Sequence, residues 1–387
     1  MAPFISFVRR ELSILLGAIT DLNSDRRLWS NVEGVWPGGW GFRSTGARLL
    51  AALFGLLVTA CGGSAGLAAS PQEHVDLRLG LSANLTHATA LVGLRQGFFA
   101  TALGPDIGLR TATFSAGPEA VTALLSNSID ATYIGPNPAI NAFTQSHGRA
   151  VRIVSGASSG GASLVVKPGI TSLTDLRGKR LATPQLGNTQ DVALRYWLSR
   201  NGLKTTLEGG GDVSIHPQDN AQTLQTFRAG QIDGAWVPEP WATRLVLEGG
   251  GKVLLDERDL WPDGLFATTL LVVRTEYLRQ HAGVVRRLIE GQVRSNAFVN
   301  SQPADAQRLA SASINEITGR PLSDQIVARA WTRLTFTNDP IAASLRDSAQ
   351  HASQVGLLPR VDLRGIFDPS LLNQSLASQG EPTVMGL

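Results

Sequence analysis

The polar residues best placed for chemistry lie where an apolar strand gives way to a helix. In the stretch TPQLGNTQD (183–191), a strand end is followed by Gly187, which permits close approach, and by Asn188 and Thr189, which open a helix. Backbone N–H groups at a helix N-terminus bind anions and are assisted by the helix dipole. No Gly-Lys-Ser/Thr follows, so nucleotide binding by a Walker A loop is disfavoured. The alternative is an ordinary capped helix.

Three further loops have the same position after a strand: SANLTHA (82–88), SAGPEA (115–120) and GPNPAI (135–140). Each loop alone is explained as well by a structural turn, and a lone His is commonly an ordinary loop residue. Their shared position on one rim nevertheless indicates ligand contacts, whereas no convincing metal-ligand spacing is found. The candidates in the four loops are Asn84, Thr86, His87, Ser115, Gly117, Gly135, Asn137, Gln185, Asn188 and Thr189.

The elements that must position these loops alternate between strand and helix. Such alternation predicts βαβ units, a parallel sheet and an α/β fold, with a mostly helical region from 275 to about 358. The predicted strands are 75–81, 108–117 (strand, then turn), 130–134, 150–157, 179–184, 212–217, 232–237, 252–257 and 266–274, and the predicted helices are 88–103, 118–127, 139–147, 171–178, 188–203, 220–230 and 239–250.

The sequence contains an internal repeat, IDATYIGPNPA from Ile129 and IDGAWVPEPWA from Ile232. Each copy joins a strand to a helix through a Pro-containing turn, so two lobes facing each other would place both turns in one cleft. The alternative is that βαβ units resemble one another by composition alone. We expect Asp130 and Asp233, which precede their strands, to satisfy turn backbone groups and not to bind ligand.

The composition is that of a globular protein of two lobes. The chain has 387 residues, 43% hydrophobic and 17% charged, with a formal net charge of +3. A chain of this length exceeds one ordinary core. Because no long basic run exists, nucleic-acid binding has no electrostatic footprint.

The only cysteine, Cys61, ends the short apolar run LLAALFGLLVTAC, which follows Arg43 and Arg48. The run is too short to span a membrane but suits a signal peptide. Val58-Thr59-Ala60-Cys61 resembles a bacterial lipobox, which predicts a leader and lipoprotein signal peptide over 1–61, lipidation at Cys61 and a flexible tether over 62–74. The alternatives are an ordinary signal peptide or a buried apolar helix. Residues 1–42 do not fit a signal peptide, and our hypothesis is that the translation start has been placed too far upstream.

From about residue 75 to 340 the chain resembles the solute-binding proteins of bacterial ABC importers. Within them it is similar to the nitrate/sulfonate/taurine group, and most like aliphatic sulfonate-binding lipoproteins. The stretches that carry the resemblance are GPNPAINAF, SLTDLRGKRLATPQLGNTQDVALRYWL, FRAGQIDGAWVPEPWATRL and LFATTLLVVRTEYLRQHAGVV.

This resemblance implies a type II periplasmic-binding-protein fold, with two α/β lobes joined by two hinge crossings near 158–166 and 266–274. Lobe one is then 75–162 plus 272–358 and lobe two 163–271, with a C-terminal tail over 359–387. It also implies that Glu239 faces the cleft, where its carboxylate could pair with an amine such as that of taurine. Trp241 would form an apolar wall, and Thr268 would close over the ligand with Phe266 and Thr269. The structural alternatives are helix-dipole stabilisation for Glu239 and strand packing for Thr268.

The function implied is a receptor without catalytic activity or cofactor that captures a small organic anion, an aliphatic sulfonate above others. We expect a monomer that delivers the anion to ABC permease and ATPase subunits. It would be held by a lipid anchor at the outer face of the cytoplasmic membrane, or lie in the periplasm. Taurine, nitrate and a thiamine or pyrimidine precursor are alternative ligands, and a sensory module is another reading. An enzyme similar to the cysteine-dependent desulfinases is disfavoured, because Cys61 is the only cysteine.

Overall fold

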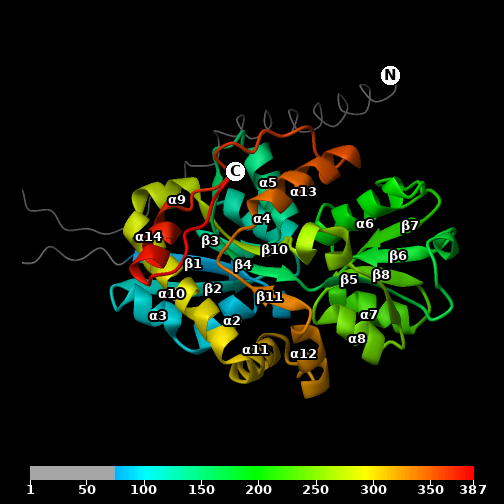
Figure 1. Ribbon diagram of the computed structural model, residues 1–387, viewed down its shortest axis with the longest axis horizontal. Helices are drawn as coiled ribbons and strands as arrows, with labels where there is room; N and C mark the ends of the chain where they lie inside the picture. The colour runs from blue at the N-terminus through cyan, green and yellow to red at the C-terminus, as the bar shows by residue number, and fades with distance from the viewer. Residues whose placement is uncertain (1–74) are drawn as a thin grey trace, which may run out of the picture. The chain divides into compact units, whose positions relative to one another are not determined.

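The computed structural model describes residues 75–387 and contains two β-sheets flanked by helices (Figure 1). The predictions for 1–61, for Cys61 and for the tether 62–74 lie outside the described residues. We call the six-stranded sheet with its helices the first lobe, and the five-stranded sheet with its helices the second lobe. No helix within 75–387 combines the length and the apolar character needed to cross a membrane.

The sheet of the first lobe has six strands in the order β11-β4-β10-β3-β1-β2. The strands are β1 (Val75–Leu81), β2 (Ile107–Thr113), β3 (Ala131–Ile134), β4 (Val151–Gly160), β10 (Ala267–Arg274) and β11 (Leu334–Phe336). The helices are α2 (Ala88–Arg95), α3 (Phe98–Leu103), α4 (Gly117–Leu125), α5 (Pro136–Gln145), α9 (Thr275–Gln280), α10 (Ala282–Ser301), α11 (Pro303–Thr318), α12 (Asp324–Trp331), α13 (Ala342–Gln354) and α14 (Ser370–Ser378).

The sheet of the second lobe has five strands in the order β7-β6-β8-β5-β9. The strands are β5 (Ala162–Val166), β6 (Arg180–Thr183), β7 (Ser214–Pro217), β8 (Gly234–Pro238) and β9 (Lys252–Asp256), and the helices are α6 (Thr189–Arg200), α7 (Asn220–Arg228) and α8 (Trp241–Leu247).

Each sheet is mixed, so the prediction of a parallel sheet is only partly right. β1 is parallel to β2 and β3, and β6 is parallel to β7 and β8, as βαβ units require. β10 runs antiparallel to β3 and β4, and β5 runs antiparallel to β8 and β9. β5 and β10 each follow a crossing between lobes and not a helix within one lobe. Each therefore enters its sheet from the other end and runs antiparallel to the strands that βαβ units place there.

The alternation of buried side chains shows why helices cover both faces of each sheet. In β5, Leu164 and Val166 belong to one apolar cluster and Val165 to another. In β8, Trp236 belongs to the first of these clusters, whereas its chain neighbours Ala235 and Val237 belong to the second. Strands buried on both faces need a helical layer on each. The side chain of Trp236 is fully buried in this core.

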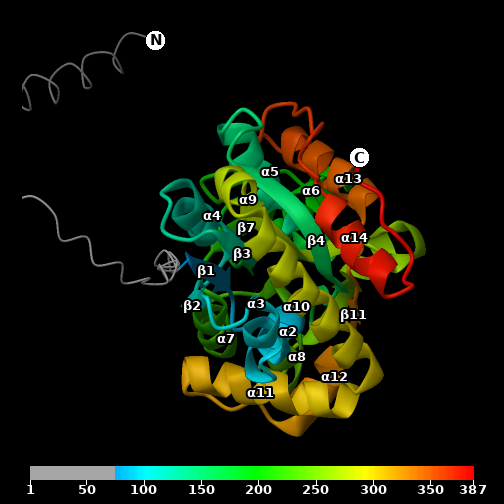
Figure 2. The ribbon, with the colours of Figure 1, turned by 90° about the vertical axis from the view of Figure 1, so that its left-hand side faces the viewer.

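Several predicted elements differ in extent. The helix predicted over 88–103 is broken at Gly97, whose φ of +72° ends α2 and starts α3. The helix predicted over 171–178 shrinks to a 3-10 turn, Thr174–Leu176. β11 lies in the region predicted as mostly helical, where it pairs with β4. Residues 359–387, predicted as a tail, contain α14, which packs against α10 (Figure 2).

The chain passes between the lobes through a pair of glycines at the end of β4. Gly160 and Gly161 have φ values of +74° and +69°, and together they turn the backbone from one sheet into the other. A Cβ at Gly160 would lie 2.5 Å from the carbonyl oxygen of Arg333, so side chains are excluded sterically as well. The return passes through the 3-10 turns Glu257–Leu260 and Pro262–Gly264 before β10, so it precedes the predicted segment 266–274.

The repeated sequence has a repeated structural role. Asp130 Oδ2 accepts the backbone N–H of Arg78 at 2.9 Å, and the Asp130 N–H returns a bond of 2.8 Å to the Arg78 carbonyl. In the second lobe, Asp233 makes the same reciprocal pair with Arg180, at 2.8 and 2.7 Å. The prediction that both carboxylates satisfy turn backbone groups is only partly right: they accept backbone N–H groups, but of the neighbouring strand and not of a turn.

Candidate functional site

A small polar cavity lies between the two lobes and is lined by residues of both. Its volume is about 40 Å³, enough for a few water-sized groups at about 10–15 Å³ each. Among the residues predicted to bind ligand, those lining it are Asn84, Thr86, His87, Ser115, Gly117, Gly135, Asn188, Thr189 and Thr268.

The first turns of several helices meet at this cavity. Gly117 begins α4, Gly135 precedes α5, and Asn220 begins α7. Each helix N-terminus brings a partial positive charge and orphan N–H groups. α5 contributes fewer donors than the others, because Pro136 and Pro138 lack an N–H.

The first turn of α6 has backbone N–H groups that lack an acceptor among the described residues. Asn188 is the N-cap, with extended backbone and no side-chain cap bond, and its carbonyl accepts the N–H groups of both Asp191 and Val192. Within the described chain, no acceptor is found for the N–H groups of Thr189 and Gln190. Two backbone donors at the N-terminus of a twelve-residue helix are thus available at the cavity wall.

Three buried polar atoms at the cavity have no hydrogen-bond partner within the described residues: Thr189 Oγ1 and Asn220 Oδ1 from the second lobe, and Thr269 Oγ1 from the first. Thr269 is 1% and Thr189 5% exposed. A buried polar group without a partner costs about 1–3 kcal/mol. Their convergence on one space indicates that a polar guest completes the bonding.

His87 is a neutral donor at this site. Its Nδ1 accepts the backbone N–H of Ser82 at 3.2 Å, which leaves the proton on Nε2. Burial lowers the pKa of His87 from 6.5 to about 3, so the ring carries no charge at neutral pH. An Nε2–H donor suits an oxyanion without supplying a counter-charge.

A charged guest in the cavity would meet dipoles and no side-chain counter-charge. None of the described residues that line it is Lys, Arg, Asp or Glu. Thr268 is limited to accepting a bond from a guest, because its hydroxyl already donates to the Gly160 carbonyl at 2.6 Å. The site is therefore rich in neutral donors and has no carboxylate to pair with an ammonium group.

The lobes approach so closely that a glycine is required at their contact. A Cβ on Gly135 would lie 2.3 Å from Thr189 Oγ1, across the cleft. Gly135 has a φ of −72°, so its small size and not its backbone freedom matters here.

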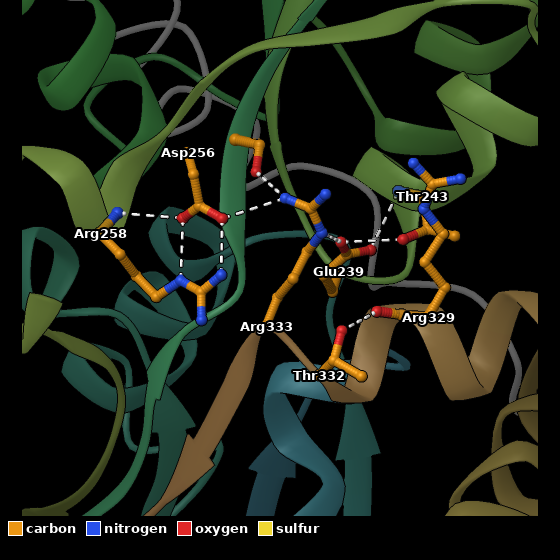
Figure 3. A network of polar contacts seen from close by, with 8 residues as sticks. Glu239, Thr243, Asp256, Arg258, Arg329, Thr332 and Arg333 are labelled. Carbon is orange, nitrogen blue, oxygen red and sulfur yellow. Dashed lines mark hydrogen bonds and ion pairs between the residues drawn. The ribbon is translucent and has the colours of Figure 1, made fainter.

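Glu239, predicted to face the cleft, lies outside the cavity and is fully buried. Figure 3 shows its polar contacts with Thr243 and Arg333. Its carboxylate accepts the N–H and the hydroxyl of Thr243, at 3.0 and 2.9 Å, and lies 3.6 Å from Arg333 Nε. Arg333 also reaches Asp256 at 3.0 Å. Burial raises the pKa of Glu239, although the bonds from Thr243 and the charge of Arg333 oppose the shift. Arg333 comes from the first lobe, so this network joins the lobes beside the Gly160 crossing.

Three other predicted residues also lie outside the cavity. Asn137 Nδ2 donates to the Ser348 carbonyl at 3.1 Å, within the first lobe. Gln185 lines a neighbouring groove of the second lobe with His216. Trp241 lines an adjoining space, and its Nε1 donates to Asn84 Oδ1 at 2.8 Å, across the lobes.

The sequence reasoning missed some residues that line the cavity. Asn220 opens a helix directly after a strand, the same signal that selected Asn188, and could have been found by applying that rule again. Gln190 and Tyr133 lie inside predicted elements, where only the packing of the lobes brings them to the cavity.

Comparisons with known proteins agree with this architecture. The model of the NMT1-like family matches residues 70–314. The taurine-binding periplasmic protein of Escherichia coli (strain K12) is 26% identical over 286 residues, which cover 70% of this chain and 85% of that protein. The putative aliphatic sulfonates-binding protein of the same strain is 24% identical over 274 residues, or 69% and 82% of the two chains.

The structure of the alkanesulfonate-binding protein of Xanthomonas axonopodis pv. citri bound to MOPS superposes with a TM-score of 0.64 at 21% identity, covering 76% of this chain and 98% of that one. The predicted fold class, two α/β lobes joined by two crossings as in periplasmic binding proteins, is confirmed. The resemblance to the nitrate/sulfonate/taurine group is likewise confirmed. With more than half of its length matched by the family model, the chain belongs to the NMT1-like family.

Proposed function

We propose that this protein is the substrate-binding component of an ABC importer and captures an organic anion, an aliphatic sulfonate, in the cavity between its lobes. The observation that carries the proposal is the convergence of helix N-termini and of the unpartnered hydroxyls of Thr189 and Thr269 on a space without charged side chains. A sulfonate stays ionised at every physiological pH and offers three acceptor oxygens, which match neutral donors.

Binding would shift an open–closed equilibrium toward the closed form, because the ligand bonds to both lobes at once. The closed form would then be delivered to the permease and ATPase subunits. We further propose that the mature protein is a monomer held by a lipid on Cys61, at the outer face of the cytoplasmic membrane or in the periplasm. The motif around Cys61 and the periplasmic relatives support these points.

The dipole-lined cavity favours sulfonate over taurine, since no carboxylate among its described lining residues can pair with an ammonium group. It also disfavours a thiamine or pyrimidine precursor, because Trp241 lies outside the cavity and offers no stacking wall within it. Nitrate remains the second candidate on the ground of size, since 40 Å³ accommodates a small inorganic anion.

Isothermal titration of the purified protein with ethanesulfonate, butanesulfonate, taurine, nitrate and a thiamine-pyrimidine precursor tests the proposal. We expect the alkanesulfonates to bind more tightly than taurine and nitrate. Tight binding of the pyrimidine alone, with no heat from any sulfonate, would refute it.

A further inference from the structure

A buried ion pair lies behind the backbone donors at the start of α6. Asp191, in the first turn of the helix, is 0% exposed, and Arg195, one turn later, is 1% exposed. Neither residue lines the cavity, whereas Asn188, Thr189 and Gln190, which precede Asp191 directly, all line it. The pair is thus part of the same helix start that presents N–H groups to the cavity.

Asp191 fixes the shape of the turn that carries these donors. Its Oδ2 accepts the N–H of Gly187 at 2.9 Å, and its Oδ1 accepts the hydroxyl of Thr183 at 2.9 Å. Thr183 ends β6 and Gly187 has a φ of +74°. Since the Asn188 side chain makes no cap bond, the Asp191 carboxylate is what ties the strand end and the left-handed turn to the helix start.

The same carboxylate places a negative charge in the helical turn where an anion would bind. Like charges repel, and the repulsion is stronger in a buried site than in water. Arg195 Nε lies 3.1 Å from both oxygens of Asp191, so the guanidinium cancels this charge. Arg195 is held there by a bond of 2.7 Å from its Nη1 to the Thr206 carbonyl.

Stability alone gives little reason for an ion pair at this place. Desolvation of two buried charges opposes their attraction, so such a pair contributes little to folding. In addition, the buried Nη2 of Arg195 has no hydrogen-bond partner within the described residues. Elements α5 and β8 also pack against α6 and contain no charged side chain, so neither supplies an alternative counter-charge for Asp191.

Building on the proposed function, we infer that Asp191 and Arg195 are positioning residues for anion binding. Asp191 holds the turn so that the N–H groups of Thr189 and Gln190 are presented to the cavity. Arg195 cancels the charge that this bracing brings close to the ligand. The two tasks are separable, because the amide in Asp191→Asn can accept from the Gly187 N–H and donate to the Thr183 hydroxyl without carrying a charge.

Titration of the full-length protein and its variants with ethanesulfonate tests the charge-cancelling role. Arg195→Met leaves the Asp191 charge uncompensated, and we expect affinity to fall about tenfold. Adding Asp191→Asn to this variant removes the charge and keeps the brace, so affinity should return to within about threefold of that of the natural protein. Asp191→Asn alone leaves a positive charge behind the donors and should bind ethanesulfonate at least as tightly as the natural protein.

A second double variant tests the brace. Asp191→Ala with Arg195→Met has neither charge nor brace, and its affinity should stay about tenfold or more below that of the natural protein, because two hydrogen bonds to the turn are lost. The matched control is Arg286→Met, which breaks the i,i+4 ion pair with Glu290 on α10, away from the cavity lining, and should leave affinity unchanged. Denaturant unfolding of each variant establishes that it is folded.

The outcomes separate the inference from the proposed function. If Arg195→Met and Asp191→Asn bind as the natural protein does and weaker, respectively, or if the Asn and Ala double variants bind alike, the pair is only structural and the inference is overturned. The proposed function then stands, because the natural protein still binds the sulfonate. Absence of sulfonate binding by the natural protein would refute the proposed function and, with it, the inference.

Discussion

Trp241 Nε1 donates a 2.8 Å hydrogen bond to Asn84 Oδ1, and the two residues belong to opposite lobes. Trp241 begins α8, whereas Asn84 follows β1. Under the proposed open–closed equilibrium, this bond would form only in the closed form and would stabilise that form alone. Side chains outside the cavity would then change ligand affinity through closure.

The variant Trp241→Phe should weaken ethanesulfonate binding by about fivefold, since one hydrogen bond contributes about 1 kcal/mol net. Titration calorimetry measures the affinity, and small-angle scattering with ligand present measures closure. Trp197→Phe is the control, because Trp197 packs edge-on against Trp236. Trp197 lines neither the cavity between the lobes nor the adjoining space that Trp241 lines. Unchanged affinity in Trp241→Phe would show that the bond does not contribute to closure.

The variant Thr189→Val replaces a buried hydroxyl that lacks a partner. We expect the ligand-free protein to unfold at the same or a higher denaturant concentration, because a desolvated polar group is removed. Sulfonate affinity should fall at least tenfold. Thr132→Val is the control: this buried hydroxyl donates to the Tyr133 carbonyl, so its loss should not improve stability. A destabilised Thr189→Val protein with normal affinity would contradict the assignment.

The variant Gly135→Ala should hold the lobes apart. Its Cβ would lie 2.3 Å from Thr189 Oγ1, well inside contact distance. We expect a tenfold or greater loss of affinity and a larger radius of gyration with ligand present. Gly283→Ala, where the added Cβ has no neighbour within 4 Å, should behave like the natural protein. Normal closure of Gly135→Ala would show that Thr189 can move aside.

His87 should make stability depend on pH. Its folded pKa of about 3 lies below the unfolded value of 6.5, so the unfolded chain binds more protons in that range. The stabilising effect is present above pH 6.5 and is lost as the pH falls toward 3, by at most about 1.4 kcal/mol per pH unit. Denaturant unfolding at pH 7.5, 6 and 5 measures the slope.

The variant His87→Asn retains an acceptor for the Ser82 N–H but cannot take up a proton, so its profile should be flatter. His351, whose pKa burial lowers to about 4, adds a slope of the same sign to both proteins, and the difference between them isolates His87. Parallel profiles would contradict a buried neutral His87.

The variant Arg333→Met should lower the free energy of unfolding by about 2–4 kcal/mol, because it leaves Glu239 buried without its cation. Burial already raises the folded pKa of Glu239 above its unfolded value, so the loss should grow as the pH rises from 5 to 8. Adding Glu239→Gln to this variant should restore part of the stability. A double-mutant cycle without coupling would show that the network in Figure 3 contributes nothing.

The strand–helix order and the cleft between lobes were predictable because strands and helix starts leave local signals. β1 was predicted with its observed bounds, and Asn188 was recognised as the residue before a helix. The antiparallel direction of β5 and β10 was not predictable in this way. The strand direction depends on which lobe the chain has just left, and the local sequence pattern does not indicate this.

Side-chain direction was the second limit. Glu239 follows a strand at the correct edge of the sheet, yet its carboxylate turns toward Thr243 and Arg333. Arg333 is distant in sequence, and its arrival from the other lobe makes burial of the carboxylate tolerable. Asn137 is similar, since its partner on α13 is known only once the helices pack.

The reciprocal bonds of Asp130 and Asp233 brace the two sheets, while Gly160 and Gly161 carry the chain between them. If ligand closes the lobes as proposed, this crossing would let binding change the distance between them. Fluorophores on Leu125→Cys in the first lobe and Leu207→Cys in the second, both exposed in the natural protein, would then report the concentration of the captured molecule as a distance. The same crossing would make the protein a scaffold for an optical sensor.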